Sequence, residues 1–231
     1  MERKIDTLPR HVAIILDGNG RWAKSKRMPR FYGHSVGVKN LTKIADYANF
    51  LGIKYLTVYA FSVENWSRPQ KEVDYLMNLL DKNFSKIIKD GTDLKVRVIG
   101  ETDKLSEKLL KEIKTVQEKT KDNTGMTLNI AFNYGGKDEI VHACKCIIDA
   151  KEEINKDNIA KYLYTAQAGD VDLLIRTSGE ERLSNFLLWQ NAYSEMYFTK
   201  TYWPAFSKKD FDKAIGEYSK RERRFGKLKN E

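Results

Sequence analysis

The chain has 231 residues, 41% of them hydrophobic, which is enough for a substantial core and too few for several large domains. Its formal net charge of +9 indicates an anionic partner, such as nucleic acid, an anionic membrane surface or a phosphorylated small molecule. The sequence shows neither an apolar leader nor a run of about 18 uncharged apolar residues, so we expect a cytoplasmic protein without a membrane-spanning helix.

Six apolar or β-rich runs predict six strands, over residues 12–16, 55–61, 95–99, 126–132, 171–175 and 196–198. Apolar residues at helical spacing predict about seven helices, of which four can be placed, over 36–51, 71–89, 105–116 and from 140 onwards. This alternation is typical of an α/β fold with a mostly parallel sheet flanked by helices. No linker interrupts it, so we expect a single domain over 1–231, with an N-terminal extension at 1–10 and a basic tail at 220–231.

The first predicted strand leads directly into an acidic residue and two glycines. Residues 12–16 are apolar without alternation, as in a strand covered on both faces, and Asp17 follows at its carboxyl end. Ligands collect at this edge of open α/β sheets, where Gly18 and Gly20 let backbone N–H groups approach an anion. Arg21 adds a guanidinium for phosphate, and Asp17 is a hard oxygen ligand suited to Mg²⁺. The alternative interpretation is a tight turn with a solvated aspartate.

Charged and polar residues also follow the other predicted strands. After the first strand, Arg30 and His34 extend the phosphate contact in this interpretation. Polar clusters follow the second and fifth strands, and Glu195 lies near the start of the sixth; the clusters contain Ser62, Glu64, Asn65, Trp66 and Arg68, and Arg176, Arg182 and Ser184. Arginines brought together without an anion would repel one another, so we expect these residues to meet Asp17 around an anion in one crevice.

The helix predicted over 71–89 has an apolar face wider than one contact with a sheet requires, because it contains Leu76, Met77, Leu79 and Leu80. Ordinary core packing explains such a face. This is the interpretation that base rates favour, and the alternative is that part of the face lines a cavity for a long hydrocarbon.

Two other functions fit part of the pattern. Residues 18–23 match the G-x-G-x-x-A pattern of dinucleotide-binding enzymes, but those enzymes need an acidic residue about 20 positions onward, and the next predicted strand ends only at residue 61. A nucleic-acid-binding module would explain the net charge, yet it needs arginines along an exposed face rather than beside carboxylates. We therefore expect no nucleic-acid partner.

Five motifs and a basic tail occur in order along the chain. They are H-V-A-I-I-L-D-G-N-G-R-W-A from His11, R-F-Y-G-H from Arg30, F-S-V-E-N-W-x-R-P from Phe61, N-Y-G-G from Asn133 and I-R-T-S-G-E-x-R-L-S-N-F-L-L-W-Q from Ile175, followed by Glu195 and R-E-R-R-F-G. In these motifs the sequence resembles the cis-prenyltransferase family, and most closely the bacterial undecaprenyl diphosphate synthases. The resemblance implies an α/β enzyme with a hydrophobic tunnel. Such enzymes condense isopentenyl diphosphate repeatedly onto an allylic diphosphate, usually farnesyl diphosphate, in cis geometry.

The resemblance also implies roles for individual residues. Asp17 would hold Mg²⁺ with assistance from Glu195, and Asn65 is the family's proposed proton acceptor. A neutral amide is a poor base, so we interpret Asn65 as a positioning group. Isopentenyl diphosphate would be bound by Arg176, Arg182, Leu183 and Ser184. The allylic substrate would be bound by Gly18, Asn19, Gly20, Arg21, Trp22, Arg30 and His34, with Ser62, Val63, Glu64, Trp66 and Arg68 close around it.

One position departs from the family pattern: Val63 stands where Ser or Thr is common, which alters one hydrogen bond. Product length is set at the far end of the tunnel, for which the candidate lining residues are Ala60, Met77, Met126 and Leu128. The aspartate-rich D-D-x-x-D signature of the all-helical trans-prenyl synthases is absent from the sequence.

The resemblance further implies an assembly and a location. Members form homodimers in which the C-terminal segment approaches the partner's active site, and here that segment contains Arg223, Arg224 and Gly226. We expect a cytoplasmic enzyme that contacts the inner face of the membrane peripherally when it releases its product, which would be undecaprenyl diphosphate for the cell-wall carrier lipid.

Overall fold

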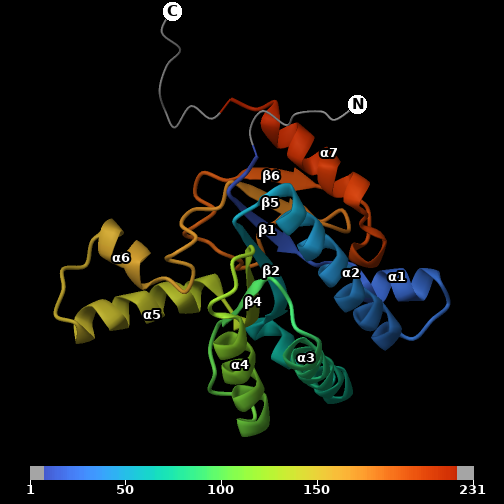
Figure 1. The fold of residues 1–231 in the computed structure, drawn as a ribbon, viewed down its shortest axis with the longest axis horizontal. Coiled ribbons are helices and arrows are strands. Elements are labelled where there is room, and N and C mark those ends of the chain that lie inside the picture. Colours follow the sequence, from blue (N-terminus) through green and yellow to red (C-terminus); the bar gives the residue numbers. More distant parts are fainter. Residues whose placement is uncertain (1–7, 223–231) are drawn as a thin grey trace, which may run out of the picture.

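The computed structural model describes residues 8–222, and at its centre is a six-stranded sheet in which every neighbouring pair of strands is parallel (Figure 1). The strands lie in the order β3-β4-β2-β1-β5-β6. Their bounds are His11–Ile15 (β1), Tyr55–Ser62 (β2), Lys95–Ile99 (β3), Thr127–Tyr134 (β4), Leu173–Arg176 (β5) and Glu195–Phe198 (β6). The predicted six-stranded parallel sheet is confirmed, although β5 starts two residues later than predicted.

Seven α-helices and two short 3₁₀-helices flank the sheet within the described residues. They are α1 (Asn19–Ser25), α2 (Arg30–Leu51), α3 (Gln70–Asp90), α4 (Glu107–Thr120), α5 (Gly136–Asp149), α6 (Lys156–Tyr162) and α7 (Lys208–Ser219), with η1 (Val63–Ser67) and η2 (Trp203–Ala205). The four helices placed from apolar spacing are α2 to α5. Helix α4 begins at Glu107 rather than at 105, because the Ser106 hydroxyl caps it by accepting from the backbone N–H of Leu109. No helix in residues 8–222 combines the length and apolar composition that crossing a membrane requires.

Strand β1 is buried along its whole length, as its uninterrupted apolar run predicts. Val12 and Ile14 belong to a core cluster that also receives side chains from α2, α3, α4 and α7. Ala13 and Ile15 belong to a second cluster that includes Phe186. Because successive side chains of a strand point to opposite faces, β1 anchors both halves of the core.

The carboxyl ends of β1, β2 and β5 lie side by side at one edge of the sheet. The register pairs Ile15 with Tyr59 on β2 and with Arg176 on β5. From β1 the chain passes to β2 on one side, and it later enters β5 on the other side of β1. The loops after these strands therefore separate around β1, which is where open α/β sheets bind their ligands.

Candidate active site

The loop after β1 is fixed by its backbone. Gly18 has a φ of +99°, a left-handed conformation that favours glycine, and a Cβ there would lie 2.7 Å from Tyr202 Cδ1. The carbonyl of Asp17 accepts hydrogen bonds from Thr177 Oγ1 at 2.7 Å and from the backbone N–H of Trp203 at 3.0 Å. The Asp17 side chain remains partly exposed, at 27%. The loop is thus held rigidly while its carboxylate faces the ligand edge of the sheet.

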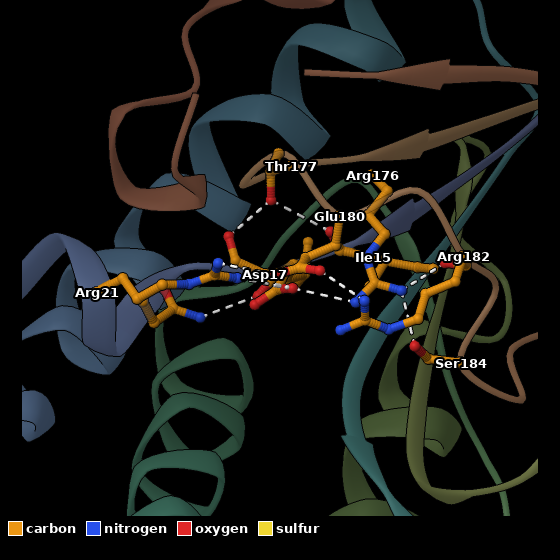
Figure 2. A network of polar contacts seen from close by, with 10 residues as sticks. Ile15, Asp17, Arg21, Arg176, Thr177, Glu180, Arg182 and Ser184 are labelled. Carbon is orange, nitrogen blue, oxygen red and sulfur yellow. Dashed lines mark hydrogen bonds and ion pairs between the residues drawn. The ribbon is translucent and has the colours of Figure 1, made fainter. Parts of the chain in front are cut away.

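Asp17 belongs to a network of polar contacts that joins the loops after β1 and β5 (Figure 2). Its Oδ2 lies 3.1 Å from Arg176 Nη2 and 3.2 Å from Arg21 Nη2. The buried guanidinium of Arg176 also donates from Nη1 to Ser184 Oγ at 2.7 Å and to the carbonyl of Arg182. One buried arginine therefore connects the predicted metal ligand to the predicted diphosphate site of β5.

Glu180 links the same two loops through their exposed arginines. Its carboxylate accepts from Arg21 Nη1 at 2.9 Å and from Arg182 Nη1 at 2.5 Å. These hydrogen bonds, the one from Arg182 first, lower the pKa of Glu180. The motif containing Glu180 could be recognised in the sequence, but nothing in the sequence indicated that this residue joins Arg21 to Arg182.

A small cavity of about 180 Å³ gathers the residues predicted to bind the first diphosphate. It is lined by Leu16, Asp17, Gly18, Asn19, Gly20, Arg21, Arg30, His34 and Arg68. All except Leu16 were candidates from the sequence, and they come from the first strand's loop, α2 and the segment after β2. The structure thus brings three arginines and one carboxylate together around one small cavity.

Glu72, in the first turn of α3, contacts three of the residues that line this small cavity. The sequence alone did not identify it as a candidate. Its buried carboxylate lies 3.1 Å from Arg68 Nη1, 3.4 Å from Arg30 Nε and 3.5 Å from His34 Nε2. Burial on its own would raise the pKa of Glu72, but Arg30 and Arg68 outweigh it and the pKa is lowered. Burial lowers the pKa of His34 despite the nearby carboxylate. One signal in the sequence could have indicated the contact between Glu72 and Arg68: the two residues are four positions apart, a spacing at which oppositely charged side chains often pair.

A much larger cavity, of about 1,530 Å³, shares Asp17, His34 and Arg68 with the small one. Its volume exceeds the roughly 300–1,000 Å³ of ordinary small-molecule sites. The apolar part of its lining comes from α2, α3 and strands β2 to β4, with Leu41, Ala60, Phe61, Leu76, Leu79, Leu80, Phe84, Ile87, Val96, Leu128 and Ile130. Its polar lining includes Asp17, Arg176, Ser184 and Asn185, together with charged residues of α2 and α3 such as Lys43, Lys86 and Asp90. The charged residues around Asp17 and the apolar lining therefore face one continuous cavity.

Two of the four residues predicted to line the far end of a tunnel line this cavity, namely Ala60 and Leu128. The other two do not. Met126 precedes β4 and is buried in the core at 3% exposure, and Met77 is partly buried against the same core cluster. The wide apolar face of α3 both packs against the core and lines the large cavity, since Leu76 and Leu80 do both.

The 3₁₀-helix η1 fixes the side chain of Asn65. In a reciprocal cap, Asn65 Oδ1 accepts from the backbone N–H of Ser62 at 3.2 Å, and the Ser62 hydroxyl accepts from the backbone N–H of Asn65. The indole of Trp66 donates to Asn133 Oδ1 at 2.6 Å. Ser62, Asn65 and the neighbouring Glu64 line the large cavity. The carbonyl oxygen of Asn65 is therefore already bonded, which agrees with a positioning role.

The expectation that Glu195 meets Asp17 in one crevice is wrong within a single chain. Glu195 opens β6 opposite Leu173, whereas Phe198 at the other end pairs with Arg176. Glu195 therefore lies about 10 Å along the strands from the ligand edge, at the amino end of the sheet. Its Oε2 accepts from Arg221 Nη1 at 2.7 Å. The sequence placed Glu195 at a strand, but the start of a parallel strand faces away from the edge where β1 ends.

Some predicted site residues lie beside the cavities without being part of their lining. Trp22 stacks on Tyr32, with ring centroids 6.0 Å apart. Leu183 packs against the core cluster that contains Phe186. Val63, Trp66 and Arg182 also lie outside the two linings. Three residues of the predicted tail contact, Arg223, Arg224 and Gly226, fall outside the described residues.

Known proteins resemble this chain along almost all of its length. Residues 15–226 match the family model described as "Putative undecaprenyl diphosphate synthase". An isoprenyl transferase of Fusobacterium nucleatum is 53% identical over 233 residues, covering 100% of both chains. A ditrans,polycis-undecaprenyl-diphosphate synthase, (2E,6E)-farnesyl-diphosphate specific, of Micrococcus luteus is 48% identical, covering 96% of this chain and 92% of the relative.

The fold also matches a solved structure. The lavandulyl diphosphate synthase of Lavandula x intermedia, crystallised with dimethylallyl diphosphate, superposes with a TM-score of 0.89 at 35% identity, covering 95% of this chain and 99% of that one. The predicted resemblance is thereby confirmed by motifs, by full-length similarity and by fold. The chain belongs to the undecaprenyl diphosphate synthase family of cis-prenyltransferases.

Proposed function

We propose that this enzyme elongates prenyl chains in cis geometry by condensing isopentenyl diphosphate repeatedly onto farnesyl diphosphate, and that its product is undecaprenyl diphosphate for the cell-wall carrier lipid. The observation that carries the proposal is the continuity between the small cationic cavity and the large, mostly apolar one at Asp17. An allylic diphosphate needs an anion site at one end and an apolar, water-poor space for its growing chain. The proposed product length and the proposed allylic primer are those that the name of the Micrococcus luteus relative states.

The two diphosphates would occupy the two groups of arginines. We assign the allylic diphosphate to the small cavity, where Arg21, Arg30 and Arg68 lie with the backbone of residues 18–20. Isopentenyl diphosphate would bind at Arg176, Arg182 and Ser184. Since Asp17 and Glu180 already neutralise several of these guanidinium groups, each diphosphate would exchange places with an internal carboxylate when it binds.

The residues present fit Mg²⁺ as a cofactor. Residues 8–222 contain no cluster of three or more His, Cys, Asp or Glu side chains that could hold a metal by themselves. Mg²⁺ is commonly bound by one or two carboxylates together with phosphate oxygens and water, and Asp17 supplies such a carboxylate beside the proposed diphosphate site. When bound, the ion would stabilise the negative charge that develops on the departing diphosphate.

The condensation breaks the C–O bond of the allylic diphosphate and forms a C–C bond to the terminal alkene carbon of isopentenyl diphosphate. The arginines of the small cavity would stabilise the departing diphosphate, and the apolar lining would exclude water from the carbocation-like carbon. The bond to C4 leaves a cation at C3 of the isopentenyl unit, and a proton must then leave C2, the carbon between C3 and the diphosphate-bearing C1, to form the new double bond. We assign the proton to the released diphosphate or to a water molecule, and we assign Asn65 the task of orienting the homoallylic substrate, because an amide is too weak a base.

We also propose that the enzyme acts as a homodimer in the cytoplasm and contacts the inner face of the membrane peripherally to release its product. Exposed apolar side chains on α5, Val141 at 52% and Ile148 at 62%, support an interface between two chains. The net charge of +9 favours an anionic lipid surface.

The decisive experiment incubates the purified protein with farnesyl diphosphate, labelled isopentenyl diphosphate and Mg²⁺ and sizes the products by chromatography. We expect a long-chain polyprenyl diphosphate from the wild type and a loss of about 10²- to 10³-fold in kcat for Asp17→Ala. Chelation of Mg²⁺ should have a similar effect. Asp122→Ala, in an exposed turn after α4, serves as the matched control and should retain full activity. A wild type that forms no product, with Asp17→Ala indistinguishable from it, would contradict the proposal.

A further inference from the structure

Asn185 follows Ser184 directly, and both of its side-chain hydrogen bonds are made with two other segments. Its Nδ2 donates to Glu64 Oε1 at 3.0 Å, and its Oδ1 accepts from the backbone N–H of Lys137 at 2.9 Å. Its own carbonyl accepts from the backbone N–H of Gly136 at 2.7 Å. Asn185 therefore joins the loop after β5 to η1 and to the start of α5.

Both neighbouring segments carry parts of the proposed site. Glu64 lies in η1 beside Asn65, and the start of α5 continues the N-Y-G-G motif of residues 133–136. That motif leaves space for the junction, because a Cβ on Gly135 would lie 2.2 Å from Asp138 Oδ2, 2.9 Å from Asn185 Nδ2 and 3.0 Å from Val63 Cγ2. A larger residue at 135 would therefore displace the side chains of Asp138 and Asn185.

Ser184, which precedes Asn185 in the loop after β5, contacts the charged network of Asp17 and Arg176. Ser184 Oγ accepts from Arg176 Nη1 at 2.7 Å, and Arg176 in turn contacts Asp17. A chain of contacts therefore runs from Asp17 through Arg176 and Ser184 to Asn185, and then to Glu64 next to Asn65.

The residue type at 185 matches what the junction demands. Glu64 needs a donor, since burial would raise its pKa and the hydrogen bond from Asn185 helps to lower it instead. The backbone N–H of Lys137 needs an acceptor, and the carboxamide of Asn185 offers a donor and an acceptor on two separate atoms of one short side chain. Asn185 also has a φ of +62°, and asparagine tolerates this left-handed conformation better than most residues.

We propose that Asn185 is a positioning residue that fixes the isopentenyl diphosphate site at Ser184 relative to the proton-transfer site at Asn65. The inference rests on the proposed function, because it uses the assignment of those two sites. A displacement of about 1 Å between bound groups is enough to cost about 10²-fold in rate. Asn185 lines the large cavity beside Ser184, and it would govern the orientation of the homoallylic substrate through the two segments that it joins.

The test exchanges donor and acceptor across the junction. Asn185→Asp keeps the size of the side chain, its tolerance of the left-handed backbone and the acceptor for Lys137, but it places a second carboxylate against Glu64. We expect kcat/KM for isopentenyl diphosphate to fall by 10- to 100-fold, with KM for farnesyl diphosphate within about twofold of wild type. Adding Glu64→Gln restores a hydrogen bond with the roles reversed, and this double variant should recover at least about tenfold relative to Asn185→Asp.

Glu64→Gln alone completes the double-mutant cycle, so any direct effect of Glu64 on substrate is subtracted. Asn185→Gly, which keeps the backbone conformation and removes both side-chain hydrogen bonds, provides the same readout if Asn185→Asp does not fold. Equal losses for Asn185→Asp with and without Glu64→Gln, or KM values for both substrates that change together with the melting temperature, would overturn the inference. A wild type without activity would instead contradict the proposed function itself.

Discussion

At the scale of single residues, carboxylates set the charge of the candidate site. Asp17, Glu72 and Glu180 each contact two or more cationic side chains, and these contacts hold the arginines of the two proposed diphosphate sites in place. Glu180 differs from the other two because its partners, Arg21 and Arg182, are both considerably exposed, at 44% and 61%. It can therefore release them when an anion arrives at small energetic cost.

Replacement of Glu180 by Gln tests this interpretation. The change removes the negative charge that competes with diphosphate for Arg21 and Arg182, so inorganic diphosphate should bind about two- to fivefold more tightly, a small gain because exposed ion pairs are weak. Titration calorimetry at constant ionic strength measures the effect. Glu181→Gln, which changes the exposed neighbouring carboxylate, is the matched control and should change the affinity little. Unchanged or weaker binding in Glu180→Gln would show that Glu180 does not compete with the ligand.

At the scale of elements, much of the fold could be predicted because its signals are local. The apolar run of β1 and the helical spacing in α3 are properties of neighbouring residues, and both elements were placed correctly. By contrast, α1 and α6 have seven residues each, too few for a helical period to be visible. Glu195 was assigned to the wrong edge although it was predicted near the start of β6, because the start of a strand in a parallel sheet lies at the edge opposite the one where β1 ends.

In the candidate site, too, the residues with a local sequence signal were predicted and those that depend on distant partners were not. Residues within recognisable motifs, such as Arg21 and Arg68, were predicted and lie together in the small cavity. Glu180 and Asn185 stand in a quoted motif, but their importance comes from partners 159 and 121 residues away, Arg21 and Glu64. Contacts of this kind are created by the topology of the sheet, so no spacing rule in the sequence could reveal them.

Helix α3 offers a test of the proposed hydrocarbon space. Leu80 lines the large cavity, and a bulkier side chain there would shorten the apolar space while leaving the charged end unchanged. Leu80→Trp should therefore shift the products toward chains shorter by at least one five-carbon unit, although the first condensation is retained. Product sizing on reversed-phase thin-layer plates measures the shift. Lys82→Trp, on an exposed position of the same helix, is the control and should leave the product length unchanged. Identical products from both variants would exclude this cavity as the site of the growing chain.

At the scale of the whole molecule, the described chain has one compact sheet but an apolar surface that it does not cover itself. Val141 and Ile148 are seven residues apart on α5, so they lie on the same face of that helix, two turns apart, and more than half of each side chain is exposed. Exposed Lys145 lies between them on the same face, and apolar side chains are enriched in interfaces between identical chains. This face of α5 is therefore the surface at which we place the proposed dimer contact.

Because a two-fold interface uses the same surface twice, a single substitution changes it in both subunits. Val141→Lys places two charges at the proposed contact and should raise the dimer dissociation constant at least tenfold, which corresponds to about 1.4 kcal/mol. Sedimentation velocity over a series of protein concentrations measures the equilibrium, and thermal unfolding verifies that the variant is folded. Phe50→Lys removes an even more exposed apolar side chain, at 81%, from α2 and should leave the dimer intact. If Phe50→Lys dissociates the dimer and Val141→Lys does not, or if the wild type is monomeric at every concentration, the α5 face is not the interface.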